Sequence, residues 1–206
     1  MKNTFKIALA VIACLSLAFT NPRNGDPKQI TVVIDAGHGG YDHGAKFEGH
    51  FEKDIVAQIT KKIIAQNDDI NVTIHLTRSE DTFLSLDDRI ALINKLQPDL
   101  VLSLHVNQTT NAEASGIEFY VSASNTAFEK SKAMAKQLDE KMTQNHDLKS
   151  RGVQEAGFKI LKKSEFPAIT MELGFLSNAY DRKLLTDDEE QHRIAATIVS
   201  FISELK

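Results

Sequence analysis

One short stretch, residues 31–40, constrains the fold and the chemistry of this chain more than any other part of the sequence. A run of β-branched residues leads through Asp35 to His38, and three glycines surround that histidine. β-branched residues favour a strand and glycines allow a tight turn after it, so we expect His38 to be presented at a strand end. Glu52 follows twelve residues after the last of these glycines. An accessible imidazole followed by a carboxylate is typical of the start of a zinc site.

Two later strand patterns also end in side chains that carry chemistry. Residues 100–106 form an apolar run in which His105 is one of only two polar residues, and residues 168–173 form another that contains Glu172. In sheets built from alternating strands and helices, ligands gather beyond the carboxyl ends of the strands. We therefore expect His38, His105 and Glu172 to meet at one edge of a sheet.

The first twenty residues have the pattern of an export signal. Two lysines precede an apolar stretch at residues 7–19, which is too short to span a bilayer but suits the apolar core of a signal peptide. We predict a signal peptide at residues 1–20, a short polar linker at 21–29 and one catalytic domain at 30–206. A chain of 206 residues with 42% hydrophobic content is sufficient for a single buried core.

The single cysteine, Cys14, lies within the apolar stretch, so no disulfide can form inside the chain. Residues 11–14 resemble a bacterial lipobox, in which lipidation of the cysteine would anchor the protein to a membrane. The apolar run continues past Cys14, which favours ordinary cleavage near residues 18–20. In both cases we expect an exported protein in the periplasm or the extracellular space.

The charge of the chain limits its partners. The formal net charge is −4, and removal of the two lysines in residues 1–20 changes it from −4 to −6. An acidic domain without a basic stripe argues against nucleic acid as a partner.

Strand and helix patterns alternate over residues 30–206 and predict an α/β fold. We expect a three-layer sandwich with a central, mostly parallel or mixed sheet flanked by helices. Ser85 with Asp88, and Asp187 with Glu190, have the spacing of helix-capping pairs. Strands are expected at residues 30–34, 70–77, 100–106, 116–121 and 168–173, and helices at residues 52–66, 85–96, 126–143 and from 187 onward. The pattern at residues 153–161 is ambiguous and permits a strand.

The candidate side chains suit metal-assisted hydrolysis of an amide. A catalytic zinc ion takes about three protein ligands and keeps one position open, and His38, Glu52 and His105 supply such a set. Glu172 is the available proton carrier, and its neighbours Met171, Leu173 and Phe175 are expected to desolvate it and raise its pKa. No serine, cysteine or lysine stands in a nucleophile setting. We therefore predict one Zn²⁺ per chain.

Six motifs, in order from about residue 30 to the C-terminus, resemble those of the zinc-dependent N-acetylmuramoyl-L-alanine amidases of the type 3 family. They are Asp35-Ala-Gly-His-Gly-Gly40, Gly49-His-Phe-Glu-Lys-Asp54, Leu76-Thr-Arg78, Ser103-Leu-His-Val-Asn107, Gly152-Val-Gln-Glu-Ala-Gly157 and Met171-Glu-Leu-Gly-Phe-Leu-Ser-Asn178. The resemblance implies zinc binding by His38, Glu52 and His105, with Glu172 as the catalytic glutamate. It also implies that the substrate is peptidoglycan or its muropeptides, cleaved between the lactyl group of N-acetylmuramic acid and L-alanine.

Two other functions remain open at this point. A zinc peptidase that cuts within the stem peptide would use the same metal chemistry, and a non-catalytic wall-binding protein would keep only a relic of the site. The intact ligand set together with Glu172 speaks against the relic.

The segment after the second histidine bears on regulation. Some members of the family carry a long helical insertion there, which covers the site until a partner removes it. Here residues 106–115 join His105 directly to the next strand, and ten residues are too few for a helix that crosses a cleft and returns. We therefore expect no activator protein. We also expect the protein to be a monomer.

Other polar residues have plainer expectations. His43 and His50 lie in the loop at residues 41–51, where a solvated position is expected. Arg78 either holds the end of the sheet together or meets a substrate carboxylate, and Asn107 is expected to orient the loop at His105.

Overall fold

The computed structural model describes residues 28–205. The predicted signal peptide at residues 1–20, the lipobox at Cys14 and nearly all of the linker at residues 21–29 lie outside the described residues. None of the helices within residues 28–205 has the length and hydropathy needed to cross a bilayer.

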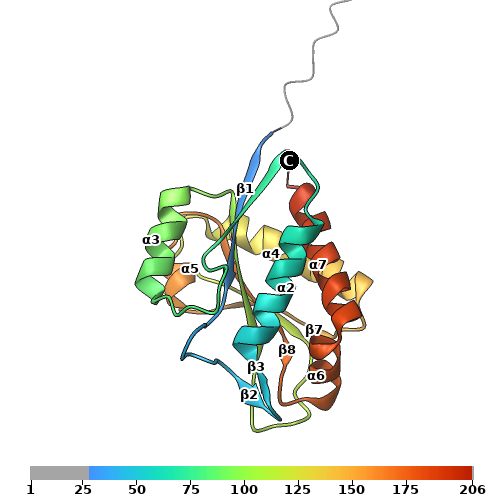
Figure 1. Ribbon diagram of the computed structural model, residues 1–206. Coiled ribbons are helices and arrows are strands. Elements are labelled where there is room, and N and C mark those ends of the chain that lie inside the picture. The colour runs from blue at the N-terminus through green and yellow to red at the C-terminus, as the bar shows by residue number, and fades with distance from the viewer. Residues whose placement is uncertain (1–27, 206) are drawn as a thin grey trace, which may run out of the picture.

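A six-stranded mixed sheet forms the centre of the molecule (Figure 1). In spatial order its strands are β4 (Val72–Leu76), β1 (Ile30–Ala36), β5 (Leu100–Asn107), β8 (Ala168–Phe175), β6 (Ile117–Val121) and β7 (Ser150–Glu155). The first four strands run parallel, whereas β6 pairs antiparallel with β8 and β7 runs parallel to β6. The carboxyl ends of β1, β5 and β8 therefore lie at the same edge of the sheet as the amino ends of β6 and β7.

Helices cover both faces of this sheet, which confirms the predicted three-layer α/β sandwich (Figure 1). The helices are α2 (Glu52–Gln66), α3 (Leu86–Leu96), α4 (Phe128–Asn145), α5 (Lys159–Lys163), α6 (Ala179–Thr186) and α7 (Asp188–Ser203). The buried side chains of α2, α4 and α7 form one core cluster with one face of the sheet, and α3 and α5 form a smaller cluster with the other.

The side-chain alternation of the strands decides which residues face the smaller layer. Successive side chains of a strand point to opposite faces. Val33, Val101 and Ala168 pack in the cluster of α3 and α5. Counting on by twos from these three positions leads to Asp35 in β1, to His105 in β5 and to Glu172 in β8. The polar residues at the three strand ends thus lie on the α3 and α5 face of the sheet.

The predicted caps are present. Ser85 caps α3 by accepting a hydrogen bond from the Asp88 amide, and Asp187 caps α7 by accepting one from the Glu190 amide. The predicted strand at residues 70–77 is shorter than expected. It begins at Val72, because residues 69–71 form a turn that leaves Ile70 91% exposed.

Three other segments differ from what the sequence patterns indicate or are not anticipated by them. The ambiguous segment at residues 153–161 is not one strand, because β7 ends at Glu155 and α5 begins at Lys159. Helix α6 is not predicted, although Asn178 caps it by accepting hydrogen bonds from two backbone amides. The loop at residues 41–51 contains a small hairpin of β2 (Lys46–Phe47) and β3 (His50–Phe51).

Candidate metal centre

Three side chains from separate parts of the sequence converge at the carboxyl edge of the sheet. His38 follows β1, Glu52 is the first residue of α2, and His105 lies near the end of β5. One nitrogen or oxygen atom from each lies within 4.8 Å of the others, and the three could hold a metal ion. Two imidazoles and one carboxylate form the donor set of many catalytic zinc sites. The donor chemistry therefore fits zinc.

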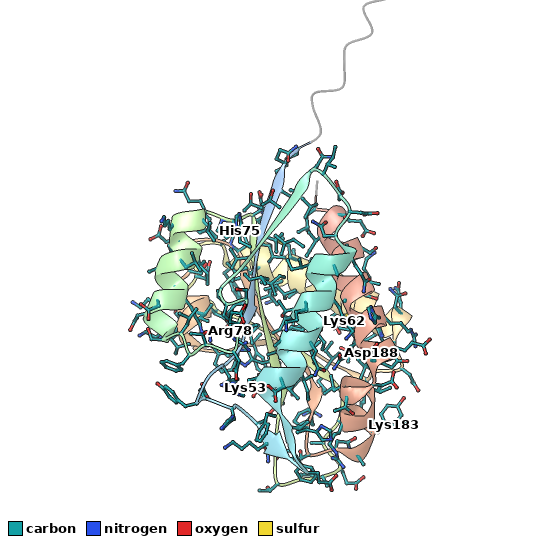
Figure 2. The ribbon with its side chains drawn as sticks, viewed as in Figure 1. Lys53, Lys62, His75, Arg78, Lys183 and Asp188 are labelled. Atoms are coloured by element: carbon teal, nitrogen blue, oxygen red, sulfur yellow. The ribbon has the colours of Figure 1, made fainter. Side chains whose placement is uncertain are left out.

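The backbone at His38 adopts a left-handed conformation, with φ of 59°, which is uncommon for a residue other than glycine. Two buried arginines hold this turn by donating to its carbonyl oxygens. Arg89 Nη2 donates to the His38 carbonyl at 2.5 Å, and Arg78 Nη2 donates to the Gly37 carbonyl at 2.8 Å. Arg78 Nη2 also donates to the backbone carbonyl of Lys53 at 3.2 Å, and both residues are labelled in Figure 2. Arg78 thus holds the end of the sheet together, which is the first of its two predicted roles.

Close packing around the cluster explains two glycines. A Cβ atom at Gly37 would lie 2.5 Å from the His105 ring, and one at Gly44 would strike both the Glu52 carboxylate and the His38 ring. Gly37 is therefore required by the approach of His105, and the φ of Gly37 is not among the positive values of this turn.

Hydrogen bonds orient each of the three donors. His38 Nδ1 contacts Asp42 Oδ2 at 2.8 Å, which leaves Nε2 facing Glu52 at 3.1 Å. A carboxylate on the far nitrogen is the usual way of fixing the tautomer of a metal-binding histidine. Glu52 accepts from the backbone amides of Ala45 and Val106, at 2.8 and 3.0 Å, and contacts His105 Nδ1 at 2.8 Å.

The electrostatics of the cluster favour a charged carboxylate. Burial alone would raise the pKa of Glu52, but hydrogen bonds and charge from His105 and His38 hold it well below its usual range. Burial alone would lower the pKa of His38, but Glu52 and then Asp42 outweigh it and raise that pKa to about 9. The pKa of His105 is raised for the same reason, by Glu52. In the metal-free protein Glu52 therefore favours protons on both imidazoles, and a metal ion that binds there displaces them.

Glu172 lies directly beside this cluster. In the register of β5 and β8 it is opposite His105, and both line a cavity of about 250 Å³ together with Leu86, Phe158 and Ile160. Its Oε2 atom is buried and has no hydrogen-bond partner within residues 28–205. Burial raises its pKa to about 7.

The cause of this pKa shift differs from the one expected from the sequence. Met171 and Leu173 point to the opposite face of the sheet, where they belong to the larger core cluster. The apolar walls that surround the Glu172 cavity come from Leu86 at the start of α3 and from Phe158 and Ile160 at α5. Because these walls are remote in sequence, the neighbours of Glu172 in the chain do not reveal them.

A fully buried carboxylate, Asp35, supports the site from below. It accepts hydrogen bonds from Thr77 at 2.7 Å, from Ser103 at 2.6 Å and from Arg89 at 2.7 Å. These three partners join β1 to β5, to the end of β4 and to α3. The Arg89 charge and these hydrogen bonds overcome burial and lower the pKa of Asp35. Since Arg89 also holds the His38 turn, Asp35 is a positioning residue that sequence reasoning missed.

Other residues lie outside the cluster of donors. His43 stacks on Phe51 with 4.9 Å between ring centroids and is half-buried, so the expected solvated position is correct only for His50. The Asn107 side chain donates to Glu118 and accepts from its neighbour Gln108, and it makes no hydrogen bond to His105. Sequence reasoning also missed Asp42. Its position four residues after His38 was the available signal, because the short loop between them lets the carboxylate reach the imidazole.

Comparison with known sequences identifies relatives along almost the whole described chain. The family described as N-acetylmuramoyl-L-alanine amidase matches residues 32–204. The uncharacterized protein YqiI of Bacillus subtilis is 35% identical over 196 residues, which cover 95% of this chain and 91% of YqiI. The N-acetylmuramoyl-L-alanine amidase LytC of the same organism is 33% identical over 168 residues, which cover 82% of this chain but only 34% of LytC.

Solved structures agree with this result. The crystal structure of N-acetylmuramoyl-L-alanine amidase from Clostridium difficile 630 superposes with a TM-score of 0.81 at 32% identity, covering 86% of this chain and 97% of that one. The CwlD amidase from Clostridioides difficile, solved in complex with the GerS lipoprotein, superposes with a TM-score of 0.79 at 28% identity. The superposition covers 85% of this chain and 98% of the CwlD chain.

Proposed function

The chain belongs to the N-acetylmuramoyl-L-alanine amidase family, and from this membership we propose that it is a zinc-dependent peptidoglycan amidase. The proposed reaction hydrolyses the amide between the lactyl group of N-acetylmuramic acid and the L-alanine that begins the stem peptide. The products are a glycan with a free lactyl carboxylate and a peptide with a free amino terminus.

In this proposal His38, Glu52 and His105 hold one zinc ion. Zn²⁺ bound there would supply Lewis acidity, which polarises an amide carbonyl and makes water acidic enough to attack at neutral pH. The protein side of the site is prepared for that role. Asp42 orients His38, backbone amides orient Glu52, and the two arginines hold the turn that carries His38.

Glu172 would be the proton carrier. An ionised Glu172 takes a proton from the attacking water, and the protonated side chain then delivers it to the nitrogen of the departing L-alanine. A pKa near the working pH lets one carboxyl group perform both steps. Its unpartnered oxygen and raised pKa support this assignment.

A single observation carries the proposal: Glu172 lines the same cavity as the two histidines of the metal-type cluster, by which we mean His38, Glu52 and His105. His38, His105 and Glu172 all line it, although they come from three different strand ends. A catalytic arrangement requires both kinds of group within reach of one substrate bond.

The identity of the cleaved bond is tested by mass spectrometry of peptidoglycan digested with the purified protein and Zn²⁺. We expect intact stem peptides that begin with L-alanine, together with peptide-free glycan. Cleavage inside the stem peptide would replace this proposal with a zinc peptidase. Wall binding without any cleavage would identify a non-catalytic relic.

We further propose that the protein is exported and acts on the cell wall as a monomer. The support for the location is its substrate, which lies outside the cytoplasmic membrane, and the sequence pattern of residues 1–20. Lipidation at Cys14 remains the less favoured prediction. Fractionation of cells that express the full chain distinguishes a released protein from a membrane-anchored one.

A further inference from the structure

A row of ionisable side chains crosses the sheet from the metal-type cluster to its far edge. His105 in β5 is opposite Glu172 in β8, and Glu172 is in turn opposite Glu118 in β6. Residues directly opposite each other on neighbouring strands point to the same face. The next strand, β7, contributes Arg151, whose Nε donates to Glu118 Oε1 at 2.6 Å. Arg151 therefore stands at the end of the row.

Glu118 fixes the position of Arg151 from below. Glu118 is buried, and its second oxygen accepts hydrogen bonds from Asn107 at 2.8 Å and from the Tyr120 hydroxyl at 3.0 Å. The Arg151 guanidinium also lies over the Phe175 ring, 5.1 Å from its centroid. An arginine held by both a carboxylate and an aromatic face is preorganised, so it loses little freedom when it binds a ligand.

The contact with Glu118 leaves most of the guanidinium available. Only Nε is engaged, and neither Nη atom of Arg151 has a hydrogen-bond partner among residues 28–205. The side chain is 38% exposed. A guanidinium with a free edge matches the two oxygens of a carboxylate.

The distances suit a substrate that extends from Glu172 towards β7. Neighbouring strands lie about 4.8 Å apart, so Arg151 is about 10 Å from Glu172 across two strand spacings. An extended peptide advances about 3.3–3.6 Å per residue. A carboxylate two or three residues beyond the scissile amide would therefore reach Arg151.

The opposite side of the cluster does not suit an anion. Near His38, Asp42 contacts the imidazole and Asp81 pairs with Lys53, and Tyr41 stacks on Phe83. The Lys53 side chain is only 9% exposed and is already paired with Asp81, so it offers little attraction to an acidic peptide, whereas an uncharged sugar needs no such partner.

We propose that Arg151 is a substrate-binding residue that pairs with a carboxylate of the stem peptide and thereby sets the direction in which the substrate lies. This inference rests on the proposed amidase function. It places the peptide over β6 and β7 and the sugar on the side of His38.

The test compares two synthetic N-acetylmuramoyl peptides, one with free carboxylates and one with the same carboxylates amidated. We expect the wild-type protein with Zn²⁺ to cleave the free form with a kcat/KM at least about tenfold higher, mainly through KM. In Arg151→Gln the ratio of the two kcat/KM values should fall to about one. Lys132→Gln is the matched control, since Lys132 is 39% exposed and lies near Glu155 of the same edge strand, and it should keep the wild-type ratio.

A purely structural role for Arg151 would change both kcat/KM values by the same factor and keep the wild-type ratio, which would overturn the inference. If Arg151→Gln fails to fold because Glu118 loses its partner, the double variant Glu118→Gln, Arg151→Gln removes the unpaired charge and must also give a ratio of about one. Equal cleavage of both substrates by the wild-type protein would refute the proposed role of Arg151 but would leave the amidase function intact. Cleavage of neither substrate would refute the amidase function, and the inference with it.

Discussion

Glu52 and Glu172 are the same residue type within one site, but their surroundings give them opposite properties. Glu52 accepts hydrogen bonds from two backbone amides and contacts two histidines, so it stays ionised. Glu172 has an unpartnered oxygen in a cavity with apolar walls, and burial raises its pKa to about 7. The environment thus favours Glu52 as a ligand and Glu172 as a proton carrier.

The first prediction separates these two roles. Glu172→Gln removes the proton carrier but none of the three metal-type donors. We expect the variant to retain one zinc per chain while kcat falls by at least about 10². Zinc content and turnover are measured on the same preparation, with the exposed Glu165→Gln as control. Loss of zinc would make Glu172 a ligand, and unchanged turnover would remove it from the mechanism.

The second prediction concerns stability and pH in the metal-free protein. The pKa of Glu172 is about 7 in the folded protein against 4.5 for an ordinary glutamate. Between these values the folded state binds a proton more tightly than the unfolded state, so the contribution of Glu172 to stability falls as the pH rises. Glu172→Gln carries no such charge. Its Tm relative to wild type should therefore be higher at pH 8 than at pH 5. An equal Tm difference at both pH values would contradict a raised pKa.

Among the elements, the loop and hairpin between β1 and α2 have the largest influence on the site. They bring Gly44 against the Glu52 carboxylate and the His38 ring, where a side chain has no room. They also present the Ala45 amide to Glu52. Because the loop closes over two of the three donors, its conformation and the geometry of the donors depend on each other.

Two glycine variants test this dependence. Gly44 and Gly49 both have positive φ, 64° and 82°, but nothing lies within 4 Å of a Cβ atom at Gly49. Both alanine variants carry similar backbone strain, and only Gly44→Ala collides with the donors. We expect Gly44→Ala to weaken zinc affinity by at least about tenfold relative to Gly49→Ala, as measured by competition with a zinc chelator. Equal affinities would show that the collision is relieved without moving the donors.

At the scale of elements, the sequence predicts best those segments whose residue pattern is determined by the burial or capping of that same segment. The apolar run of β5 and the caps of α3 and α7 are examples, since burial and capping act locally. The hairpin β2–β3 has only two residues in each strand, too few for a periodic signal. Helix α5 is similarly short, and its position depends on packing against α3.

At the scale of the whole molecule, the layered α/β architecture follows from the alternation of strands and helices. The order and direction of the strands do not, because the antiparallel placement of β6 depends on pairing between distant segments. That placement brings Glu118 beside Glu172, and Arg151 of β7 donates to Glu118. Sequence reasoning selected four side chains that the folded sheet brings together, His38, Glu52, His105 and Glu172, but it missed Asp35, Asp42 and Glu118. Their roles depend on contacts made in the folded sheet.

The connection after His105 leads to a prediction about regulation. Residues 108–116 join β5 to β6 without a helix, so this segment offers no plug for the cavity beside Glu172. We expect the purified protein with Zn²⁺ to hydrolyse soluble muropeptides at full rate. The measurement compares its rate with and without extract from its own cells. A large stimulation traced to a protein would contradict this expectation and would indicate a partner, as in the complex of CwlD with GerS.

The central claim is that His38, Glu52 and His105 hold the one zinc ion on which hydrolysis depends. It is tested most directly by elemental analysis of zinc, with amidase activity on the same samples, for wild type, His105→Ala and His75→Ala. His75 lies on the edge strand β4 and is not one of the three donors (Figure 2). We predict one zinc per chain and full activity in wild type and His75→Ala, and neither in His105→Ala, because two ligands do not complete the site. Full zinc content and turnover in His105→Ala, or full activity of wild type without zinc, would contradict the account.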